Sequence, residues 1–235
     1  MRYLKKSFLL SMLVTMACTS SAPPQQQLQT PQKLGDEEKT GNGGNIIRCS
    51  GQLPVVLDFY NATIPTLGAP APTLVDISQY TSDQVVDFFK FRFTSFPYFQ
   101  HQFEDALKAV GPMDTWLSAN LKNTKDANET YHLPQGCSQE QAAVRQGTVM
   151  YGDPDIINSL VPAQKGLLLV HEALYYIGDT VLGLRTSEKI RSVVRETLKD
   201  NSSAVALRAA IYKIGGLVSP FQIVLKKWRQ ICKQK

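Results

Sequence analysis

The segment from Pro162 to Leu182 constrains the fold of this chain more than any other, because it is long, mostly apolar and helical in its periodicity. Pro162 suits the first turn of a helix, and Gly183 suits the position after its last turn. The apolar residues fall on one broad arc of a helical wheel: Leu167, Val170, Ala173, Leu174, Ile177 and Val181. The segment therefore predicts a central helix that the rest of the core surrounds.

A narrower arc of the same helix carries ionisable side chains. His171, Tyr175 and Asp179 follow one another at intervals of one turn, and Glu172 lies beside them. Polar groups on a mostly buried helix need hydrogen-bonding partners. Two interpretations of this stripe follow from the sequence: a structural polar network and a catalytic site. We favour the structural network.

In the structural interpretation, the stripe is a buried polar network that specifies packing. Glu172 or Asp179 pairs with Arg191 or Arg195 across the turn that follows Gly183. Ser187, at the start of the next helix, belongs to the same network.

In the catalytic interpretation, His171 and Asp179 bind a metal ion such as zinc, Glu172 activates a water molecule, and Tyr175 stabilises developing charge. The metallopeptidase helix carries His-Glu-x-x-His, since two histidines one turn apart can bind one zinc ion. Here Tyr175 occupies the second histidine position, so the set is one ligand short. Asp179 or His132 could complete it.

The beginning of the chain indicates where the protein works. Arg2, Lys5 and Lys6 precede an apolar run over residues 8–17, a pattern typical of a signal peptide. The run is about half the ~20 residues that a membrane-spanning helix needs. Residues 1–17 are therefore predicted to be removed on export.

Cys18 directly follows the small residue Ala17, as the lipid-modified cysteine of a bacterial lipoprotein does. We expect a lipid on Cys18 to attach the protein to a membrane; the alternative is a soluble periplasmic or secreted protein. The segment 18–42 is rich in Ser, Pro and Gln, a composition predicted to form a disordered tether. Residues 43–235 are predicted to form a single globular domain.

The charge balance gives no sign of a nucleic-acid partner. The net charge is +5, and three of the positive charges lie in the predicted signal peptide, which leaves +2. So small a charge on an exported chain argues against nucleic-acid binding.

The remaining cysteines are expected to pair in an oxidising compartment. We favour a disulfide between Cys49 and Cys137, because Cys232 lies close to a basic chain end. The alternatives are Cys137–Cys232, Cys49–Cys232 and no disulfide. Closing a loop as long as 49–137 contributes roughly 4 kcal/mol in the chain-entropy model.

The pattern along the chain predicts an α+β fold, mainly helical, with a small antiparallel or mixed sheet packed by the His-Glu helix. Thr81 and Gln84 form a candidate capping box, and the aromatic residues that follow are expected to pack in the core. Residues 55–60 are a strand or a helical turn. Further helices are predicted at 98–110, 114–121, from 154, 188–200, 203–214 and 220–230, and strands at 46–47, 129–133, 140–146 and 148–153.

Five short motifs carry a resemblance: Gly41–Cys49, Gly136–Val144, Asp153–Leu160, Leu168–Tyr175 and Ser187–Arg191. Together they resemble an uncharacterised family of exported gram-negative bacterial proteins, which implies a periplasmic or outer-membrane location. The layout also resembles a reduced zincin, with a small sheet, a His-Glu helix and a second helix that supplies a polar partner.

The sequence therefore predicts an exported cell-envelope lipoprotein with a structural or interaction role, an envelope partner of unknown identity, and no cofactor. The alternative is a metal-dependent hydrolase, a degenerate zincin-like peptidase that acts on peptide or on an envelope polymer and would need zinc.

Overall fold

The computed structural model describes residues 44–65, 70–121, 133–184 and 186–217. The chain divides into two units, Met1–Glu38 and Lys39–Lys235, and every described residue belongs to the second. Several predicted features lie outside the described residues: the signal peptide, Cys18, the tether 18–42, His132 with most of the strand 129–133, the helix 220–230 and Cys232.

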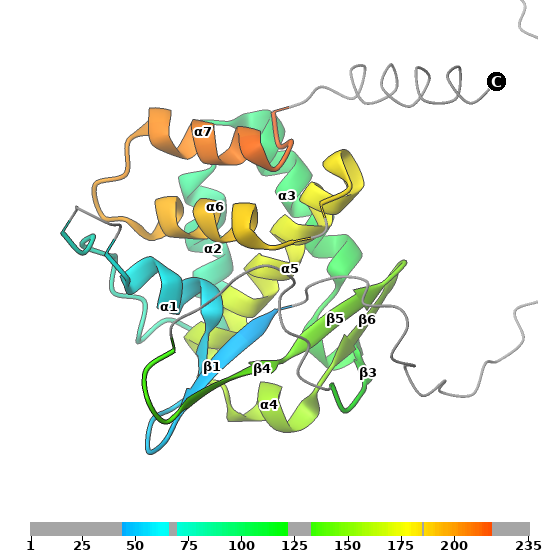
Figure 1. Ribbon diagram of the computed structural model, residues 1–235. Helices are drawn as coiled ribbons and strands as arrows, with labels where there is room; N and C mark the ends of the chain where they lie inside the picture. The colour runs from blue at the N-terminus through cyan, green and yellow to red at the C-terminus, as the bar shows by residue number, and fades with distance from the viewer. Residues whose placement is uncertain (1–43, 66–69, 122–132, 185, 218–235) are drawn as a thin grey trace, which may run out of the picture. The chain divides into compact units, whose positions relative to one another are not determined.

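The predicted central helix is confirmed as α5, Pro162–Leu182 (Figure 1). Its 21 residues make a rod about 32 Å long, and Gly183 ends it in the left-handed conformation with φ of 65°. Three helices that precede α5 in the chain pack against it: α1 (Leu57–Thr63), α2 (Ser82–Arg92) and α3 (Pro97–Val110).

The aromatic segment folds into the core, as its helical spacing predicts. Thr81 and Gln84 form the expected capping box at the start of α2. The rings of Phe93, Phe99 and Phe103 meet edge to face at centroid distances of 4.8 and 5.1 Å, and all three are fully buried. Such pairs add to the burial of aromatic surface, so this cluster is a packing element of α2 and α3.

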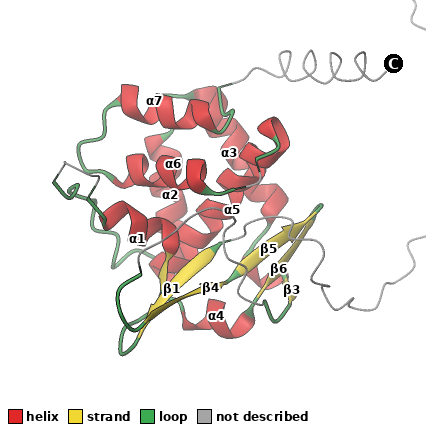
Figure 2. Ribbon diagram, in the orientation of Figure 1, coloured by secondary structure: helices red, strands yellow, loops and turns green. Residues whose placement is uncertain are grey.

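The strands form two small sheets of three strands each within the described ranges (Figure 2). The first is antiparallel, in the order β2 (Val55–Val56), β1 (Asn45–Cys49) and β4 (Cys137–Gln141). The second is mixed: the order is β3, β6, β5, and β3 runs parallel to β6. Its bounds are Leu117–Ser118 for β3, Ala143–Gln146 for β5 and Val149–Gly152 for β6. The predicted α+β class with a small antiparallel or mixed sheet is confirmed.

The remaining helices follow their local start signals. The Asp153 carboxylate accepts hydrogen bonds from the first turn of α4, Pro154–Ser159. Two further helices, α6 (Glu188–Leu198) and α7 (Ala204–Lys213), pack against each other, and α6 also packs on α5.

Within the described part of the chain, no helix combines the length and the apolarity needed to cross a membrane.

The predicted helix at 114–121 is wrong. A single 3-10 turn, Met113–Thr115, is followed by β3. The Trp116 ring donates its N–H to the carbonyl of Val110 at 3.1 Å, and the Ala119 amide donates to Gly152 on β6 at 3.0 Å. The pairing of β3 and Ala119 with β6 replaces the local backbone bonds that a helix would make.

Residues 55–60 were predicted to be either a strand or a helical turn, and they contain both. Val55 and Val56 form β2, and α1 begins at Leu57. The Val56 amide donates to the buried side chain of Gln164 on α5 at 2.7 Å, which fixes this junction on the central helix.

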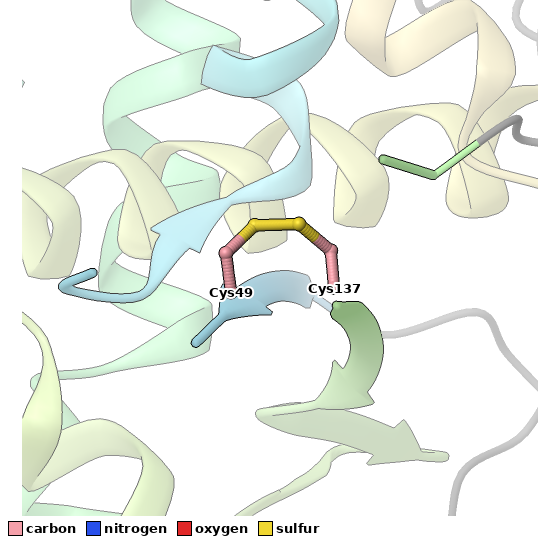
Figure 3. Close-up of a disulfide and its surroundings, with 2 residues drawn as sticks. All are labelled: Cys49 and Cys137. Carbon is pink, nitrogen blue, oxygen red and sulfur yellow. A yellow bond between two sulfur atoms is a disulfide. The ribbon is translucent and has the colours of Figure 1, made fainter. Parts of the chain in front are cut away.

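The predicted disulfide Cys49–Cys137 is confirmed, and the pairings with Cys232 are not adopted (Figure 3). The two cysteines are direct partners at the end of the β1–β4 ladder, with their Cα atoms 4.0 Å apart. They are separated by 88 residues in sequence.

Gly166→Ala is expected to destabilise the fold although alanine favours helix. A Cβ atom at Gly166 would lie 2.7 Å from the Ser82 carbonyl oxygen and from Val85 Cβ, so α2 and α5 would have to separate. We expect a loss of about 1–3 kcal/mol in urea unfolding. Gly178→Ala is the matched control: its nearest atom, Leu184 Cδ1, belongs to a side chain that can rotate. An equal loss in both variants would contradict this account.

Candidate functional site: a buried polar cluster on the central helix

The centre of the candidate site is a pair of ionisable side chains sealed between α5 and α1. His171 on α5 is 2 % exposed, and Asp58 on α1 is 1 % exposed. The His171 Nδ1–H donates to the Asp58 Oδ2 at 2.7 Å, because a carboxylate can only accept. This bond joins two helices that lie 113 residues apart in the chain.

Glu172 connects the same turn of α5 to the start of β1. Its side chain is 1 % exposed, and its Oε1 accepts the backbone N–H of Gly44 at 2.5 Å. Any side chain at position 44 would collide with α5, since a Cβ there would lie 2.0 Å from Leu168 Cδ1. Glycine therefore lets the backbone approach close enough to bind Glu172.

The surroundings of His171 and Glu172 favour the protonated form of both. Burial by itself lowers the pKa of His171, but the charge of the Asp58 carboxylate and its hydrogen bond outweigh that effect and raise the pKa. Burial raises the pKa of the Glu172 carboxyl, against the opposing influence of His171 and the Gly44 amide. The cluster thus holds its protons more tightly than the unfolded chain does.

Asp179 lies farther along α5. It pairs with Arg145 of β5, a partner that was not predicted. The Arg145 guanidinium also lies 5.1 Å from the ring centroid of Tyr176 and donates to the carbonyl of Gly147. This contact fastens the β5–β6 hairpin to the central helix.

Of the predicted network residues of α6, Ser187 and Arg191 bond to each other, and the charge of Arg191 opposes the rise in the pKa of His171. Arg191 donates to the Ser187 hydroxyl at 2.6 Å, and both side chains are buried. Ser187 stands at the predicted helix start, but its hydroxyl makes no capping hydrogen bond to the helix backbone. Arg195 donates to the Ile64 carbonyl after α1. The Tyr175 ring lies parallel to the His171 imidazole, with centroids 6.4 Å apart, and its hydroxyl donates to the Leu184 carbonyl.

The two residues proposed as metal ligands, His171 and Asp179, lie far apart along the helix. His171 and Asp179 are eight residues apart on α5, a rise of ~12 Å. Within the described ranges, no group of three or more His, Cys, Asp or Glu side chains could hold a metal ion. The His171–Glu172 pair is sealed from solvent and bonded to the backbone of β1 and to α1, an arrangement that suits packing and proton retention.

Three partners in the cluster were not predicted from the sequence: Asp58, Gly44 and Arg145. Asp58 gave a usable signal, because a single carboxylate within the apolar run 55–60 requires a buried partner. Arg145 and Gly44 reach α5 only through the sheet arrangement, which no local pattern specifies.

Comparison with known proteins returned no match: no family model, no curated protein and no solved structure is significantly similar to this chain.

Asp58→Asn is expected to destabilise the protein strongly, since it removes the charge that compensates the buried His171. Losing one partner of a buried ion pair costs about 3–5 kcal/mol, and the pKa of His171 should fall. Urea unfolding and an NMR titration of the His171 ring measure the two effects. Asp179→Asn is the control: the Asp179 side chain is 31 % exposed, so the loss should be smaller.

Glu172→Gln tests the raised pKa of Glu172. The folded state binds this proton more tightly than the unfolded chain, whose carboxyl titrates near the ordinary value of 4.5. The stabilisation is therefore complete below pH 4.5 and is lost as the pH rises through the folded-state pKa. The variant cannot ionise, so its urea midpoint should match the wild type at pH 4.5 and exceed it at pH 8.

The exposed Glu188→Gln is the matched control for that titration, and its midpoints should follow the wild type at every pH. The raised pKa of His171 also makes the folded state less stable as the pH rises. This stabilisation is complete below the ordinary pKa of 6.5 and is lost as the pH rises through the folded-state pKa. A Glu172→Gln curve parallel to the wild type over the whole range would contradict a raised Glu172 pKa.

Proposed function

We propose that this chain is an exported lipoprotein of the gram-negative cell envelope, attached to a membrane by a lipid on Cys18, with a structural or interaction role rather than a catalytic one. The basic and apolar leader and the position of Cys18 support export and lipidation. The Cys49–Cys137 disulfide fits an oxidising compartment.

The observation that carries the non-catalytic role is the burial of the polar cluster. Asp58, His171 and Glu172 are each at most 2 % exposed. A general acid or base must come within hydrogen-bonding distance of a substrate. Asp58 and His171 instead bond to each other, and Glu172 bonds to the backbone of Gly44, so these contacts of the cluster lie inside the domain.

One observation favours the metal-dependent hydrolase as a second candidate. Zinc-bound histidines commonly donate their other ring N–H to a carboxylate, and His171 donates Nδ1–H to Asp58. The Nε2 atom of His171 is buried and makes no hydrogen bond within the described part of the chain. Glu172, the next residue, would then be the base that activates water.

Mass spectrometry of the protein extracted from the cell envelope tests lipidation. We expect an N-terminal Cys18 that carries a diacylglyceryl group, and we expect Cys18→Ser to move the protein to the soluble fraction. An intact leader on a cytoplasmic protein would refute both export and lipidation. A cleaved leader without a lipid on Cys18 would support export and refute the membrane anchor.

Metal analysis after dialysis separates the two functions. We expect no stoichiometric metal, and we expect Glu172→Ala and Arg191→Ala to lower the melting temperature by roughly 5–10 °C through loss of buried hydrogen bonds. Stoichiometric metal that disappears in His171→Ala would overturn the non-catalytic role and favour the hydrolase.

A further inference from the structure

The Cys49–Cys137 disulfide lies at an edge of the fold that is accessible from solvent. Both cysteines are half-buried, whereas the next residues of the loop after β1, Ser50 to Leu53, are exposed. Beyond the disulfide, the two strands are held by one further backbone bond, from the Ser50 amide to the Gly136 carbonyl. Figure 3 shows the bridge where the β1 and β4 ribbons meet their loops.

A recess lies beside this disulfide. It has a volume of about 380 Å³ and is lined by residues 48–52 together with Gly136 and Ser138. A Cβ atom built on Gly51 or Gly136 would meet no atom within 4 Å, so the space next to both strand ends is open. Cys49 is among the residues that line the recess, so a partner segment seated there would lie against the half-buried disulfide.

The fold around the disulfide does not depend on the covalent bond for its packing. The β1–β4 ladder continues from Asn45↔Gln141 to Arg48↔Ser138. Ile46 and Ile47 in β1 are at most 1 % exposed, and the Arg48–Glu140 ion pair links the two strands at 3.0 Å. Breaking the S–S bond would lower the free energy of unfolding but leave these contacts in place.

We propose that Cys49–Cys137 is a thiol-exchange site that a dithiol protein of the envelope reduces while this domain stays folded. A thiolate of the partner attacks one sulfur, forms a mixed disulfide and releases the other cysteine as a thiolate, which takes up a proton. The partner's second thiol then attacks the mixed disulfide. Two electrons pass to this chain, which gains two thiols, and the partner leaves as a disulfide.

The proposal rests on the envelope location proposed above, because its partner is an envelope protein, but it does not require a lipid on Cys18. Exchange is measured on the purified full chain. The chain is treated with dithiothreitol at increasing urea concentrations below the unfolding transition. Alkylation and peptide mapping then follow Cys49 and Cys137 separately from Cys18 and Cys232. We expect complete reduction at a rate independent of urea, with an unchanged circular dichroism spectrum and a lower unfolding midpoint.

A rate that rises with urea in parallel with global unfolding would overturn the proposal, since the bond would then open only in the unfolded chain.

The protein partner is tested with a thioredoxin-type dithiol protein whose resolving cysteine is replaced by serine. We expect it to form a stable mixed disulfide with Cys49 or Cys137 of the folded chain. Reduction by dithiothreitol without this adduct would overturn the assignment of a protein dithiol. None of these outcomes bears on the lipid at Cys18, so failure here is distinguishable from failure of the envelope role.

Discussion

The hydrogen bond between His171 and Asp58 is the interaction on which the arrangement of the domain depends. A buried imidazole and a buried carboxylate are each costly without a hydrogen-bonding partner, and each is tolerated because the other lies beside it. The bond fixes α1 against α5. Glu172, the next residue of α5, fixes the start of β1 in the same way through Gly44. One turn of the central helix thus positions two segments from the beginning of the domain.

This dependence explains why a helix so well suited to a hydrophobic core carries ionisable groups. The apolar arc of α5 provides burial that many neighbours could satisfy, whereas a carboxylate or an imidazole accepts few geometries. Burial drives the helices together, and the polar pairs specify which elements meet. Arg145 and Asp179 repeat the principle at the far end of α5, where they hold the β5–β6 hairpin.

The parts of the fold that local chemistry controls could be predicted from the sequence. Thr81 and Gln84 form the capping box that starts α2, and Pro162 and Gly183 mark the two ends of α5. Each of these signals depends only on residues within one or two helical turns. The region 114–121 could not be predicted, because its backbone bonds to β6 more than thirty residues away. The stripe on α5 was visible in the sequence, but its partners Asp58 and Arg145 come from distant segments that only the assembled fold brings near.

The position of the disulfide in the β1–β4 ladder has a mechanical consequence. A force applied to the chain before Gly44 would first break the bond to Glu172 and then peel β1 from its neighbours. Peeling would reach Cys49 after five residues of strand and stop there, because a covalent bond joins that residue to β4. The force would then pass through the bridge to β4, so α1, α2 and α3, which lie between Cys49 and Cys137 in the chain, would be bypassed until the bridge is cut.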